Sequence, residues 1–218
     1  NPKTFTPMLK ENGCKVIHVV ANLKYALKAQ DSGCDAVVGE GVEAGGHNGA
    51  DQITTFVLIP QLVDALQIPV IAAGGIADGR GILAALALGA EGVQIGTRFA
   101  ATVESSAHEN YKRKIVEAKD NDTVLAFRKI GLVRMLKNDF AFRALKAEDE
   151  CWDEIKLKDL LGSKRECAGI FEGDEIEGEM EAGQVAGLIK DIPTVKELME
   201  RLIKEYQTSA SKLSLIVQ

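Results

Sequence analysis

The sequence predicts a protein of the α/β class, and two observations carry that prediction. Between residues 15 and 118, short apolar runs alternate with segments of helical periodicity, which is typical of parallel strands covered by helices. Three of these runs end in glycine-rich loops. Such loops after successive strands are typical of a (β/α)8 barrel, whereas an open doubly wound sheet binds its ligand at one switch point. We therefore favour the barrel architecture.

Four strand-and-helix units are visible in this stretch. The strands are predicted at residues 16–20, 35–38, 69–73 and 92–95, and the helices at residues 23–32, 53–66, 79–88 and 106–119. The strands are short and almost wholly apolar, as strands buried on both faces are. Their short connections suit right-handed crossovers between parallel neighbours.

The pattern changes beyond residue 120. Residues 122–149 and 152–161 are charged and helix-prone, which predicts an appended helical lobe. Residues 172–181 are acidic and rich in glycine, and residues 182–189 are small and apolar. Residues 193–206 fit an amphipathic helix with proline at its start. We expect the last dozen residues to be frayed.

Composition narrows the class of function. The 218 residues are 46% hydrophobic and 27% charged, which is typical of a soluble globular protein. A net charge of −6 argues against a nucleic-acid or anionic-membrane surface. The sequence has no apolar run long enough to span a membrane, no signal-like start and no CxxC pair. We expect a cytoplasmic protein without a metal site that acts on small molecules.

Two glycine loops predict a phosphate site. Gly74 and Gly75 follow one predicted strand, and Gly96 and Thr97 follow the next, with Arg98 adding a guanidinium. Glycines let backbone N–H groups approach an anion closely, and a helix N-terminus adds partial positive charge. Barrels often bind phosphate after their last two strands. The alternative is that these glycines only permit tight turns.

A third loop carries the best candidate for catalysis. His47 lies in the glycine-flanked loop at residues 40–49, and an imidazole is suited to proton transfer near neutral pH. The alternative is a solvated turn residue. His18 lies in an apolar strand and is expected to be a core residue, whereas His108 lies near a helix start and is expected to be structural.

The acidic stretch invites a cation-binding interpretation. It contains three alternate glutamates, Glu177, Glu179 and Glu181, and carboxylates are the ligands that hard cations prefer. A solvated acidic face is the interpretation we favour.

Three sequence motifs resemble one known family. Glu-Ala-Gly-Gly-His at residues 43–47, Ala-Ala-Gly-Gly-Ile at 72–76 and Gln-Ile-Gly-Thr-Arg-Phe at 94–99 resemble the nitronate monooxygenases, formerly called 2-nitropropane dioxygenases. That family includes the flavin-dependent enoyl-[acyl-carrier-protein] reductase II. The resemblance extends from residue 1 to about residue 189.

The resemblance implies an FMN-containing TIM barrel in which His47 is the catalytic residue and faces the flavin and substrate. The FMN phosphate would be held by backbone groups of the two glycine loops, and the segment around Gln184 would return toward the flavin ring. The implied cofactor-binding residues are Glu40, Gly41, Gly45, Gly46, Ala73, Gly74, Gly75, Gln94, Gly96, Thr97 and Gln184.

The resemblance also implies a division of the chain. Residues 1–120 would be the C-terminal half of the FMN-binding barrel, residues 121–192 a lobe and return segment over the substrate, and residues 193–218 a helix and tail. The family places four further units ahead of these, and four units alone cannot close an eight-stranded barrel. The chain lacks a starting Met, so we expect it to begin partway through a longer protein.

Two activities fit the resemblance. A monooxygenase would oxidise alkyl nitronates with O2, whereas a reductase would use NAD(P)H to reduce an enoyl thioester. The reductase's acidic carrier protein would need a basic patch, which residues 112–114 and 128–129 could supply. The overall negative charge counts against such a patch, so we favour the monooxygenase. A flavin-binding module without turnover is a third alternative, and a homodimer is compatible with each.

Overall fold

The computed structural model describes residues 1–216. The chain forms two compact units. The first comprises Asn1–Val42, Asp51–Gln94 and the chain from Leu202 onward, and the second comprises Glu43–Ala50 and Ile95–Arg201. The sequence predicts a division after residue 120, where the half-barrel is expected to end, and another after residue 192, where the lobe over the substrate is expected to end. Both divisions stay predictions.

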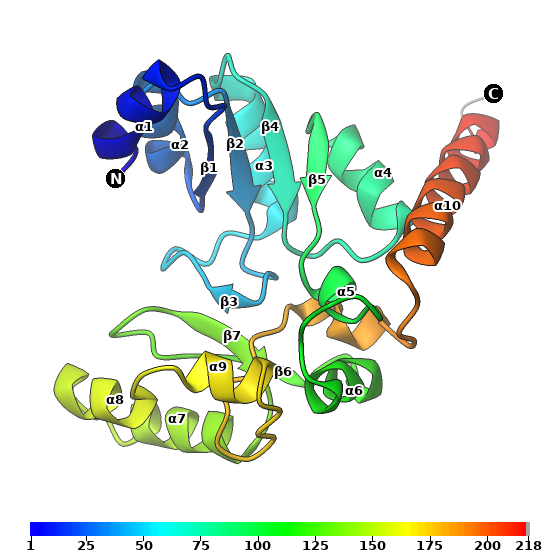
Figure 1. The fold of residues 1–218 in the computed structure, drawn as a ribbon. Coiled ribbons are helices and arrows are strands. Elements are labelled where there is room, and N and C mark those ends of the chain that lie inside the picture. Colours follow the sequence, from blue (N-terminus) through cyan, green and yellow to red (C-terminus); the bar gives the residue numbers. More distant parts are fainter. Residues whose placement is uncertain (217–218) are drawn as a thin grey trace. The chain divides into compact units, whose positions relative to one another are not determined.

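The first unit is built on a four-stranded parallel sheet (Figure 1). Its strands are β1 (Ile17–Val20), β2 (Ala36–Glu40), β4 (Val70–Ala73) and β5 (Gly92–Gln94), and its helices are α1 (Pro2–Glu11), α2 (Leu23–Asp31), α3 (Thr55–Ala65) and α4 (Gly79–Ala87). The strand order β1-β2-β4-β5 is the order of the chain, with no reversal. A barrel sheet has this order, whereas a doubly wound sheet reverses at its switch point. The α/β prediction is confirmed.

Apolar side chains on α3 fix the core of this unit. Leu58, Ile59 and Leu62 are at most 1% exposed, as are Val37 of β2 and Ala72 of β4. The three α3 residues have the three- and four-residue spacing of one helix face. The sheet and its helix are thereby held together by buried apolar area, at about 25 cal/mol per Å².

The register of the sheet aligns three strand ends. Glu40 at the end of β2 pairs with Ala73 at the end of β4, and Ala73 pairs with Gln94 at the end of β5. Because the strands are parallel, the chain leaves the sheet from neighbouring points along one edge. All three residues belong to the predicted cofactor-binding set.

The second unit contains an antiparallel sheet of order β3-β7-β6. Its strands are β3 (Gly46–His47), β6 (Thr123–Ala126) and β7 (Val133–Leu136), and its helices are α5 (Thr97–Ala100), α6 (Glu109–Glu117), α7 (Asp139–Asp149), α8 (Glu154–Leu161), α9 (Arg165–Ile170) and the 3-10 helix η1 (Gln184–Leu188). Phe127, Met135, Phe140 and Leu157 are completely buried in its core.

The helical lobe expected after residue 120 begins with a hairpin that the sequence does not predict. Residues 123–136 form the β6–β7 hairpin, and helices follow only from α7 onward. Charges on this segment hid the strand signal, because Arg134 is buried within β7 rather than solvated. Phe127 and Gly131 have positive φ angles and turn the chain between the strands.

The last helix is longer than expected. The helix α10 spans Val195–Ile216, so the expected fraying of the last dozen residues does not hold for residues 207–216, and residues 217–218 lie outside the described chain. Thr194 and Glu197 form a reciprocal capping box at its start. Within the described part of the chain, no helix combines the length and apolar character needed to cross a bilayer.

Candidate active site

The Gly74–Gly75 turn follows β4 in the first unit. Both residues have positive φ, +89° and +75°, which favours glycine. The buried Thr55 hydroxyl donates to the carbonyl oxygens of Ala73 and Gly74, at 3.1 and 2.9 Å. With the carbonyls held by Thr55, the turn has a fixed orientation. Sequence reasoning missed Thr55, because a threonine at a helix start carries no specific signal.

The α4 N-terminus does not contribute to anion binding as the sequence suggested. The Asp78 carboxylate accepts from the backbone N–H groups of Arg80 and Gly81, and the Glu205 carboxylate accepts from that of Gly79. These carboxylates already neutralise the partial positive charge of the helix end. A phosphate in this unit would therefore depend on the glycine turn itself.

In the second unit, the backbone of Gly96 is open to close approach by a ligand. Its φ of −95° is one that any residue adopts, and an added Cβ would meet no atom within 4 Å. Neither backbone conformation nor packing requires glycine here. Gly96 is exposed, so its backbone is accessible to an anionic group. The residues present fit an FMN phosphate.

Three segments of the second unit converge beside Thr97. The Gly183 N–H donates to the Thr97 hydroxyl at 2.9 Å, and the Gln184 N–H donates to the Glu43 carbonyl at 2.9 Å. A Cβ on Gly45 would lie 2.5 Å from the Ala182 backbone, so glycine is required there by packing. The histidine loop, the Gly96–Thr97 loop and the return segment thus meet in one place.

Arg98 does not serve the phosphate as the sequence suggested. Its side chain is 4% exposed, pairs with Asp191 at 3.0 Å and donates to the carbonyl oxygens of Ala101 and Asp191. Arg201 pairs with the same carboxylate at 2.7 Å. Arg98 therefore ties α5 to the segment before α10.

His47 lies on β3 with its side chain 74% exposed. Its Nδ1 atom lies 3.7 Å from Oε1 of Glu181, whose side chain is only 24% exposed. Burial raises the pKa of Glu181, and the neighbouring His47 partly opposes that rise. The exposed imidazole is accessible to a substrate, and its Nδ1 atom faces the Glu181 carboxylate.

Of the three alternate glutamates, only Glu177 fits the solvated-face interpretation. Glu177 is half-exposed and pairs with Arg143 and Arg165. Glu179 is 3% exposed, and burial, with the charges of Glu181 and Glu166, raises its pKa to about 7. Among the described residues, no group of three metal-ligating side chains is placed to hold a metal ion.

The other histidines have different roles. His108 caps α6, its Nδ1 accepting from the Asn110 N–H at 3.1 Å, which confirms the structural interpretation. His18 is only half-buried, although burial lowers its pKa. It lies on β1, an edge strand whose Ile17 and Val19 are about half exposed, so the core expectation is not met in the described chain.

The expected basic patch is largely neutralised. Lys112 is 2% exposed and pairs with Glu109, and Arg113 and Lys114 both pair with Glu175. Arg128 in turn pairs with Glu148 at 2.9 Å. These cations do not form a free surface for an acidic carrier protein.

Comparison with known proteins decides the family. The family model described as nitronate monooxygenase matches residues 1–205. This chain belongs to the nitronate monooxygenase family. It is 36% identical to a probable nitronate monooxygenase of Staphylococcus saprophyticus. The matched region covers 93% of this chain and 59% of that protein.

Two other similar proteins have different names. The chain is 34% identical to a hydroxy-methyl-oxo-octahydroindene-carboxyl-CoA dehydrogenase of Rhodococcus jostii, covering 90% of this chain and 66% of that protein. The structure of FabK from Thermotoga maritima matches with a TM-score of 0.93 and 45% identity, covering 98% of this chain and 68% of that chain. The chain therefore has the fold of part of a TIM barrel, and spans less than two thirds of the two curated relatives.

Proposed function

We propose that this chain is the FMN-binding part of an oxidoreductase that reduces α,β-unsaturated acyl thioesters. The single observation that carries the substrate class is the 45% identity to FabK, an enoyl-[acyl-carrier-protein] reductase II, over 98% of the chain. The Rhodococcus relative, named for a CoA ester, supports a thioester independently. An acyl thioester thus replaces the alkyl nitronate that the sequence alone favoured as substrate.

The proposed cofactor site consists of the aligned strand ends and the loops that follow them. Backbone N–H groups of Gly74, Gly75, Gly96 and Thr97 would hold the FMN phosphate. The remaining contacts would come from Glu40, Gly41, Gly45, Gly46, Ala73, Gln94 and Gln184. When bound, FMN would supply hydride transfer between NAD(P)H and the substrate.

His47 is the proposed proton donor. Reduction of an enoyl thioester adds a hydride at the β-carbon and a proton at the α-carbon. The exposed imidazole of His47 can give that proton to the substrate and regain it from solvent. Thr97 and Gly45 hold the loops on either side of the return segment, which fixes the position of the histidine.

A second candidate is the oxidation of alkyl nitronates with O2. The match of the nitronate monooxygenase model to residues 1–205 and the 36% identity to the Staphylococcus protein favour it. In that reaction His47 would orient the nitronate oxygens. Because both candidates use one site, the substrate decides between them.

Anaerobic half-reactions test the proposal. We expect NADH to bleach the flavin absorbance of the complete enzyme, and an enoyl-CoA such as crotonyl-CoA to restore it without O2. The same thioester on acyl carrier protein tests the carrier. Bleaching by ethylnitronate, with no recovery on either thioester, would instead support the second candidate.

A further inference from the structure

We propose that Glu181 is a positioning residue for His47, holding the imidazole through its Nδ1–H group so that Nε2 is presented to the substrate. The inference rests on the catalytic role of His47 in the proposed function. The carboxylate lies 3.7 Å from Nδ1. Hydrogen bonds in active sites are often long before substrate binds and tighten in the complex.

The sheet register places these two side chains together. His47 pairs with Val133 of β7, and Glu181 bridges to Met135, two residues further along the same strand. Side chains alternate between the faces of a strand, and residues directly opposite each other share a face. His47 and Glu181 therefore project from the same face, although 134 positions separate them in sequence.

Gly46, the residue before His47, leaves room for the Glu181 carboxylate. Gly46 pairs with Arg134, and a Cβ on Gly46 would lie 3.1–3.3 Å from the carboxylate atoms of Glu181. A side chain at position 46 would thus crowd the carboxylate beside the histidine. The positive φ of Gly46 separately favours glycine directly before His47.

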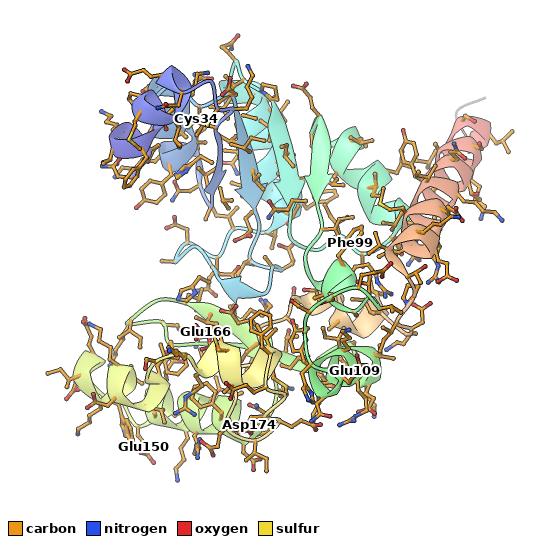
Figure 2. All side chains as sticks on the ribbon, viewed as in Figure 1. Cys34, Phe99, Glu109, Glu150, Glu166 and Asp174 are labelled. Atoms are coloured by element: carbon orange, nitrogen blue, oxygen red, sulfur yellow. The ribbon has the colours of Figure 1, made fainter. Side chains whose placement is uncertain are left out.

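The backbone of Glu181 is itself fixed. The buried Tyr111 hydroxyl donates to its carbonyl oxygen at 2.5 Å, and Leu136 N–H donates to the carbonyl of the preceding residue, Met180, at 2.8 Å. The charge of Glu181 acts on the buried Glu179, and Glu166 of α9 (labelled in Figure 2) acts electrostatically on both glutamates. The Glu181 side chain is therefore held in a largely buried position.

Ring nitrogen chemical shifts test the proposal without relying on activity. In the 15N-labelled complete enzyme, at a pH where titration shows a neutral ring, His47 should carry its proton on Nδ1. Glu181→Ala should shift the proton toward Nε2, whereas Glu181→Gln should keep it on Nδ1 because the amide oxygen still accepts. Glu177→Gln, the same change in the same segment, should shift nothing.

Kinetics completes the test. Glu181→Ala should lower kcat for crotonyl-CoA by about 10- to 100-fold, with Glu181→Gln retaining more activity, and should cause no further loss in a His47→Ala background. An unchanged tautomer in Glu181→Ala, or an equal further loss without His47, would overturn the proposal. A wild-type enzyme inactive on thioesters would overturn the proposed function instead, and the ring shifts would still decide the role of Glu181.

Discussion

At the scale of single residues, the glycines of the predicted site fall into two kinds. Gly45 packs against the Ala182 backbone, and Gly74 and Gly75 adopt left-handed conformations, so the fold itself requires them. Gly96 has neither constraint. It is therefore the residue at which ligand binding can be separated from folding.

Two alanine substitutions use that difference. Gly96→Ala should change the free energy of unfolding by at most about 1 kcal/mol, yet weaken FMN binding by about tenfold or more, which corresponds to about 1.4 kcal/mol. Gly45→Ala should destabilise the enzyme by about 2–4 kcal/mol, because its Cβ would overlap backbone atoms. Chemical unfolding and FMN titration measure both. Unchanged FMN affinity in Gly96→Ala would show that this loop is merely a turn.

A substitution at His47 separates catalysis from cofactor binding. Because the imidazole is exposed on β3 rather than packed in the core, His47→Ala should keep FMN bound while turnover falls by roughly 10²-fold or more. His108→Asn is the matched control, since asparagine preserves the α6 cap while removing an imidazole. Stopped-flow flavin reoxidation measures the rate. The wild-type rate in His47→Ala would exclude an acid–base role.

At the scale of elements, the segment at residues 177–181 differs from what its charge pattern indicates. Its alternating glutamates look like a solvated face, because a charge pattern gives no sign of what covers it. In the structure, Glu179 contacts α9 through its backbone, with its N–H donating to the Arg165 carbonyl, and its side chain is buried. One oxygen of that carboxyl, Oε1, has no hydrogen-bond partner, which makes its charged form costly.

The titration of Glu179 should be visible in stability. Its pKa is about 7 in the folded state against an ordinary value of 4.5, so the folded state holds a proton that the unfolded chain releases between these pH values. The free energy of unfolding therefore falls as pH rises through this window. Glu179→Gln removes the effect, and its advantage over wild type should grow by up to roughly 3 kcal/mol between about pH 4 and pH 8. Urea unfolding at both pH values measures it, and an equal advantage at both would contradict a buried, protonated carboxyl.

At the scale of the whole molecule, periodicity predicted the parallel sheet but not the hairpin. The strands of the first unit are nearly pure apolar runs, so their signal is local, and each boundary was within two residues. In β7 the buried Arg134 masks the pattern.

Residue types indicated the candidate site, but not its partners. The sequence identified His47 and the glycine loops. Glu181 reaches His47 only because both pair with β7, and such a long-range register is not visible in one sequence.

The identity of the bound cofactor is the most direct test of the account. The open backbone at Gly96 is proposed to approach a single terminal phosphate. The complete enzyme, purified and denatured, should release FMN, identified by mass spectrometry and present at about one per chain. Release of FAD, or no flavin even after reconstitution, would contradict the proposed site.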